Sequence, residues 1–132
     1  MSTLGEDVAD WLEARGLGSQ TGTPRLWQSE MLDEPDDGIL IREGGGAGAV
    51  RSHDLRRDLR PGITVVVRAS EDGLSAGNQL AQDVYDALLV LTNTAINGRL
   101  YKGTVPVSDV SDLGQDEKGR WKWSMNFLVT RA

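Results

Sequence analysis

A glycine-rich segment at residues 44–48 follows a short apolar run, and such a segment can cradle a phosphate group. Its glycines and Ala49 satisfy the G-x-G-x-x-A spacing of a dinucleotide-binding fingerprint, and Glu71 lies at about the distance expected of the ribose-binding acid. That fold requires a crossover helix next, whereas residues 51–60 are too few and too polar, and Pro61 stops them. We therefore interpret the segment as a flexible loop, and keep a small ligand-binding domain as an alternative hypothesis.

Carboxylates gather at two further places. Residues 33–38 (DEPDDG) contain four of them and could hold a hard cation, but their spacing lacks the alternating ligands of a calcium loop. A second group consists of Asp109, Asp112, Asp116 and Glu117. General acid catalysis there would require a desolvated carboxyl, and no adjacent residue except Leu113 is apolar enough to provide one. We interpret the first group as a solvated turn. The second lies on a strand end, at Asp109, and in a polar hairpin loop over residues 111–119.

Nucleophiles and metal ligands are scarce in the chain. It has no cysteine, which excludes a thiol nucleophile, a thiolate metal site and a disulfide framework, and is consistent with a reducing compartment. His53 is the only histidine, and no G-x-S-x-G motif is present. We therefore expect a protein that is not an enzyme, with no catalytic residues, no bound metal and no cofactor.

The chain is acidic, with 20 acidic and 14 basic residues and a formal net charge of −6. This charge disfavours general binding to nucleic acid or to an anionic membrane surface. No apolar run approaches the roughly 18 residues of a membrane span, and the first residues lack the basic and apolar runs of a signal peptide. We expect neither a membrane partner nor sequence-specific nucleic-acid binding.

Two charged segments are candidate interaction sites. The most basic part of the chain contains Arg51, Arg56, Arg57 and Arg60 beside two aspartates. It is either a solvated loop or helical turn, or an electrostatic contact with an acidic partner, and for the second case we name Arg56, Arg57 and Arg60 as interface residues. For a hairpin that reaches a neighbouring molecule, we name Asp116, Glu117 and Arg120.

The element best placed to organise these segments is a closing strand over residues 121–131. Side chains of a strand alternate between its two faces, and this alternation places five large apolar residues together. They are Trp121, Trp123, Met125, Phe127 and Val129. A helix predicted over residues 76–91 has a stripe of Leu80, Val84, Ala87, Leu88 and Leu91 and would cover that face.

The remaining pattern predicts a single α+β domain over residues 1–132. Thr3 and Glu6 have the spacing of a capping box that begins a helix at about residues 5–15. Strands are expected at residues 25–32, 39–43, 63–68 and 100–110, the last interrupted by Pro106 and therefore at a sheet edge. Because the strands occur in runs, we expect a mainly antiparallel sheet of about five strands, with the long helix packed on one face and an N-terminal helix.

Several segments, in this order, resemble a known family. They are residues 4–16 (LGEDVADWLEARG), 35–45 (PDDGILIREGG), 61–69 (PGITVVVRA) with 81–88 (AQDVYDAL), and 113–120 (LGQDEKGR) with 123–129 (WSMNFLV). Together they cover most of the chain, which resembles the tail terminator or minor capsid proteins of bacteriophages with long, non-contractile tails. The ordered set carries this resemblance rather than any single motif.

The resemblance implies a virion structural protein that forms a homo-hexameric ring at the head-proximal end of the tail. Such a ring sits on the last ring of the major tail tube protein, stops its polymerisation and offers a surface to the head–tail connector or stopper protein. DNA can pass through the ring, and assembly takes place in the host cytoplasm. No catalysis and no cofactor are implied. A connector or stopper subunit on the head side is a related alternative.

Overall fold

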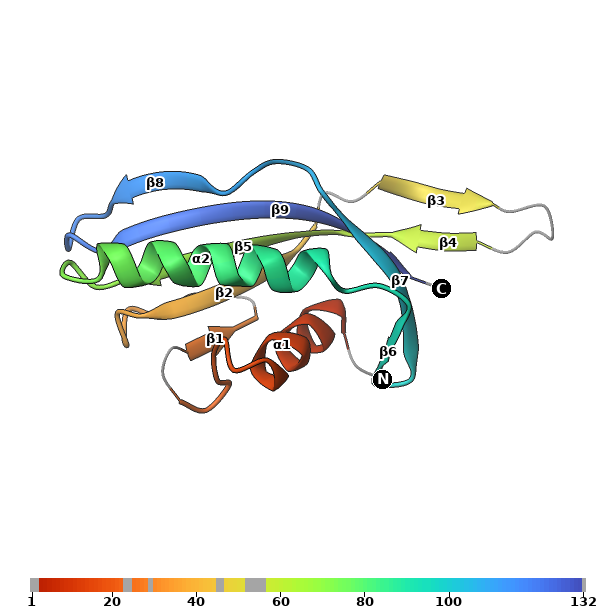
Figure 1. Ribbon diagram of the computed structural model, residues 1–132, viewed down its shortest axis with the longest axis horizontal. Helices are drawn as coiled ribbons and strands as arrows, with labels where there is room; N and C mark the ends of the chain where they lie inside the picture. The colour runs from red at the N-terminus through yellow and green to blue at the C-terminus, as the bar shows by residue number, and fades with distance from the viewer. Residues whose placement is uncertain (1–2, 23–24, 29, 45–46, 52–56, 132) are drawn as a thin grey trace.

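The computed structural model describes residues 3–22, 25–28, 30–44, 47–51 and 57–131 (Figure 1). Within these ranges the chain forms two helices and nine strands, which pair into one curled, mixed sheet. In chain order they are α1 (Leu4–Ala14), β1 (Arg25–Trp27), β2 (Gly38–Glu43), β3 (Ala47–Arg51), β4 (Arg57–Arg60), β5 (Gly62–Ala69), α2 (Leu74–Leu89), β6 (Thr94–Ile96), β7 (Arg99–Pro106), β8 (Ser111–Gln115) and β9 (Trp121–Arg131). The α+β class is confirmed, whereas the prediction of about five strands was too low.

Strand β9 lies in the middle of the sheet and pairs on both of its edges. One edge pairs with β5, from Ala69 opposite Trp121 to Gly62 opposite Leu128, and then with β4 through Leu59. The other edge pairs with β8 near its start and with β7 near its end. Four strands therefore depend on β9 for their register.

The outer strands make the sheet mixed rather than purely antiparallel. Strand β2 is antiparallel to β5, but β1 joins β2 in parallel and is only three residues long, shorter than the strand predicted at residues 25–32. Strands β6 and β7 form a hairpin whose turn residues, Asn97 and Gly98, both have positive φ angles of 51° and 81°. A tight hairpin turn of this kind favours an Asn-Gly pair, because both residues tolerate positive φ angles.

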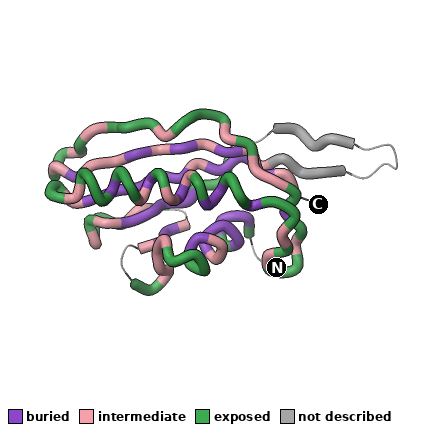
Figure 2. The backbone as a smooth tube through the Cα atoms, in the orientation of Figure 1, coloured by how far each residue is buried: buried purple, intermediate pink, exposed green. Residues whose placement is uncertain are grey.

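The core lies between the sheet and α2, as the alternation in the closing strand predicted (Figure 2). Trp123, Met125, Phe127 and Val129 are buried, and the side chains between them are half-buried. Helix α2 packs on β5 and β9. A Cβ atom at Gly77 would lie 2.6 Å from the Trp123 ring, so the absence of a side chain there lets the indole reach the helix backbone.

Helix α1 covers the core beside α2, and polar contacts hold it on two sides. Its capping box is formed as predicted, with Thr3 accepting from the backbone of Glu6. The Trp11 indole N–H donates to the carbonyl of Ala87 in α2 at 2.9 Å. On the other side, the buried carboxylate of Asp7 accepts from the Tyr101 hydroxyl, and burial together with this hydrogen bond raises the pKa of Tyr101 to about 12.

Two predicted loops contain strands. The loop predicted at residues 44–48 was wrong in its second half, because residues 47–51 form β3, which pairs with β4. A strand, and not the helix of a dinucleotide site, thus follows the glycines. The predicted loop at residues 111–119 likewise contains β8, and only its end turns. Neither strand has an alternating apolar pattern, which is why the sequence alone did not indicate them.

In the described ranges no helix is long and apolar enough to cross a membrane.

The position of Trp123 generates a stability prediction. We expect Trp123→Ala to lower the free energy of unfolding by roughly 3–5 kcal/mol, because the indole is 2% exposed and its removal leaves a cavity under α2. Urea denaturation monitored by circular dichroism measures this loss. The control is Leu113→Ala on the exposed strand β8, which we expect to cost less than about 0.5 kcal/mol. A loss below about 1 kcal/mol for Trp123→Ala would contradict the assignment of Trp123 to the core.

Candidate functional site

Three turns meet at the end of the sheet where β9 begins. They are residues 33–37 before β2, residues 70–73 between β5 and α2, and residues 116–120 between β8 and β9. Arg120 Nη1 donates to the carbonyl of Asp33 at 2.6 Å, and the Trp121 indole N–H donates to the carbonyl of Glu71 at 3.0 Å. We call these turns the acidic end, because they contain Asp33, Glu34, Asp36, Asp37, Glu71, Asp72, Asp116 and Glu117.

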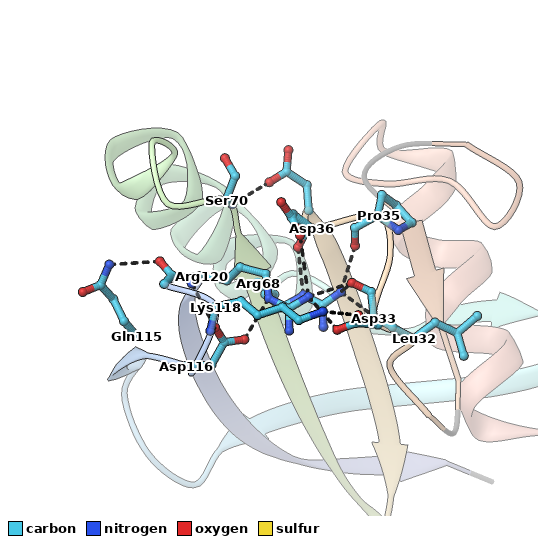
Figure 3. Close-up of polar contacts among 12 residues, drawn as sticks. Leu32, Asp33, Pro35, Asp36, Arg68, Ser70, Gln115, Asp116, Lys118 and Arg120 are labelled. Atoms are coloured by element: carbon cyan, nitrogen blue, oxygen red, sulfur yellow. Dashed lines mark hydrogen bonds and ion pairs between the residues drawn. The ribbon is translucent and has the colours of Figure 1, made fainter.

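A buried arginine of β5 shapes the first of these turns. Arg68 is 3% exposed, and its side chain donates to four backbone carbonyls in and beside the turn (Figure 3). The acceptors are Leu32 at 2.6 Å, Asp33 at 3.3 Å, Pro35 at 2.8 Å and Asp36 at 2.8 Å. Burial and the neighbouring Arg120 lower the pKa of Arg68 below its ordinary value. The turn predicted to be simply solvated is therefore organised from inside by a guanidinium group.

A second arginine joins the hairpin turn to the first turn. Arg120 is almost fully buried, and its Nε donates to Asp116 Oδ2 at 2.8 Å while its Nη1 lies 3.6 Å from Asp36 Oδ1. The exposed Lys118 ammonium forms a salt bridge with the Asp33 carboxylate beside it. The two turns consequently form one charged surface rather than separate loops.

These contacts change the acidity of two carboxyl groups. The hydrogen bond from Lys118 is the main cause that lowers the pKa of Asp33 below 3.8. Burial alone would raise the pKa of Asp116, but hydrogen bonds from the backbone and side chain of Arg120 outweigh it, and the pKa is lowered. Both carboxylates therefore remain ionised at neutral pH. Among the described residues, no three His, Cys, Asp or Glu side chains converge as metal ligands.

The structure separates the two groups of predicted interface residues. Asp116, Glu117 and Arg120 come together at the acidic end, where Asp116 and Arg120 bind each other and Glu117 is exposed at the turn. Arg57 and Arg60 begin and end β4, at the opposite end of the sheet (Figure 1), so this part of the basic segment is a strand and neither the loop nor the helical turn that was predicted. Arg56 lies outside the described residues. An interface role for all six residues stays a prediction.

Arg68 is the important residue of the acidic end that the sequence-based prediction missed. It was placed only as the last residue of a strand. One signal was available, because an arginine that ends a β-branched run of the core must find partners for its buried charge. The structure supplies backbone carbonyls of the turn at residues 33–37 as those partners.

With the fold and this charged surface described, comparison with known proteins identifies the family of the chain. Residues 5–132 match the family described as "Bacteriophage tail terminator protein", and the chain belongs to this family. It is therefore a phage tail structural protein. This confirms the family suggested by the sequence resemblance.

Solved structures show the same fold at low sequence identity. One comes from a structure titled "Virion of native gene transfer agent (GTA) particle", with a TM-score of 0.65, 14% identity and coverage of 97% of this chain and 93% of that chain. A second has a TM-score of 0.56, 15% identity and coverage of 96% and 89%. The comparison with curated proteins found no match. At these identities the similarity supports the fold alone.

The contacts of Arg68 predict a specific effect of its guanidinium group. We expect Arg68→Lys to lower the free energy of unfolding by roughly 1.5–3 kcal/mol, because a lysine ammonium cannot reach all four carbonyls and leaves some of them unpaired. Chemical denaturation measures the loss. The matched control is Arg42→Lys on β2, where the side chain is exposed and the change should be nearly neutral. Equal effects of the two substitutions would contradict the role given to Arg68.

The lowered pKa values of Asp33 and Asp116 predict that the contacts of the acidic end weaken at low pH. The folded-state pKa of Asp33 and Asp116 lies below the unfolded value of 3.8, so their stabilising contribution is complete above that value. It is lost as the pH falls through the lower folded-state values. We expect amide NMR signals of residues 32–36 and 116–120 to shift or broaden between pH 4.5 and 2.5, and Asp116→Asn to remove part of this response. Signals unchanged over the same range would contradict the prediction.

Proposed function

We propose that the chain is a tail terminator that assembles into a hexameric ring. The ring caps the head-proximal end of the tail tube, stops polymerisation of the tube protein and presents a surface to the head–tail connector. Its lumen lets DNA pass without sequence-specific contacts. In this proposal the protein acts through its interfaces alone and performs no catalysis.

The observation that carries the proposal is the match to the tail terminator family over residues 5–132, nearly the whole chain. The surface of the subunit supports it. A closed ring requires two different patches on each subunit, which meet head to tail. Val105, Val107 and Leu113 are 55%, 62% and 54% exposed on or beside the edge strands β7 and β8, where apolar contact area for another protein is available.

Ring formation and capping can be tested with purified components. We expect the protein to have the mass of a hexamer by light scattering, and electron microscopy to show rings on one end of tail tubes. Tubes assembled from the major tail tube protein should stop growing when the ring is added. A matched control adds the Trp123→Ala variant, whose loss of core packing should reduce capping.

The outcomes separate this proposal from its alternatives. A strict monomer that neither binds tube ends nor limits tube length would refute the terminator proposal. A ring that binds the connector but leaves tube growth unchanged would instead assign the chain to the head side, as a connector or stopper subunit. A hexamer that caps tubes would establish the terminator role.

A further inference from the structure

Strands β3 and β4 form an extra hairpin, which we call the arm, inserted between β2 and β5. The ladder of β2 and β5 closes with Glu43 opposite Ile63, and the Gly44 N–H donates to the Gly62 carbonyl at 2.9 Å. A two-residue turn could join the strands at this point. The arm is therefore not needed to connect β2 with β5, and another reason for its presence must be found.

Among the described residues, few contacts join the arm to the rest of its own molecule. Strand β3 pairs with β4, and in the part of the chain that the structure describes β4 pairs with the rest of the sheet at Leu59, opposite Arg131. The two helices pack on β2, β5, β7 and β9, and Figure 1 shows the arm extending beyond both helices. A two-stranded hairpin without a third strand or a covering helix is marginally stable in water. We therefore expect the arm to be stabilised by contact with a surface of another molecule.

The charges of the arm indicate what kind of surface it would bind. Strands β3 and β4 contain three arginines and one aspartate, in a chain with a net charge of −6. The acidic end has the opposite charge and offers Glu34, Glu71, Asp72 and Glu117 as exposed carboxylates. The two surfaces lie at opposite ends of β9, an eleven-residue strand of about 35 Å, so they meet only between molecules.

We propose that the arm of one copy docks on the acidic end of the next copy in the ring. The inference rests on the proposed function, because it assigns the head-to-tail interface that closes that ring. Both surfaces come from the same chain at opposite ends of one strand, so each copy supplies one and receives the other. Arg68 and Arg120 hold the acidic end in shape before contact, which lowers the ordering cost of docking.

The first test removes the arm. In the variant, an Asn-Gly dipeptide replaces residues 45–61 and joins Gly44 to Gly62. We expect it to fold with the circular dichroism and thermal unfolding of a native α+β domain, and to remain a monomer at concentrations where the unaltered chain forms rings. Rings of unchanged mass and stability from the variant would overturn the inference while leaving the terminator function in place. Absence of rings from the unaltered chain would instead contradict the proposed function.

The second test reverses charges, and it holds even if the armless variant does not fold. Glu71→Lys with Glu117→Lys changes exposed carboxylates that lie outside the Arg68 and Arg120 contacts, and we expect at least a tenfold weaker ring association that depends on salt. The control, Asp86→Lys on the exposed side of α2, should leave assembly unchanged.

Arg57→Glu with Arg60→Glu should weaken assembly in the same way, and the combined quadruple variant should restore it. Wild-type assembly by both double variants, or failure of the quadruple variant to recover any rings, would refute the docking. Rings that form without the arm but no longer cap tubes would also refute it, because they would assign the arm to the tube protein.

Discussion

The central position of β9 is the constraint on which the rest of the molecule depends. Its core face carries Trp123, Met125 and Phe127, which α2 must cover, and its two edges hold four other strands in register. Its beginning forms part of the acidic end, and its last residues receive the base of the arm. A change in this one strand would therefore disturb the core and both charged surfaces together, because a shift of one residue exchanges its two faces.

The acidic end shows how buried charge can shape an interaction surface. Moving a guanidinium group out of water is costly, and the cost is offset here by the carbonyl and carboxylate acceptors around Arg68 and Arg120. These acceptors become fixed in position as a result. The exposed carboxylates beside them then form a preorganised acidic surface, as the proposed docking of a second copy requires.

Sequence reasoning was most successful where a single element carries a strong pattern. The predicted closing strand agrees with β9, and the helix predicted at residues 76–91 agrees with α2 to within two residues at each end. Strands β3, β4, β6 and β8 were missed, since each has five residues or fewer and none carries an alternating apolar pattern. For the candidate site, the sequence indicated Asp116 and Arg120 but gave no reason to join them to the turn at residues 33–37.

The sequence by itself determined the apolar face of β9, its helical cover, the acidic character of the chain and, through an ordered set of segments, its family. These properties are local, because they follow from the period of side chains along one element and from residue type. Only the tertiary structure decided that the acidic turns meet at one end of the sheet and that β4 stands at the other. Both depend on pairing between residues far apart in the chain, and that pairing is set by how all the strands assemble around β9.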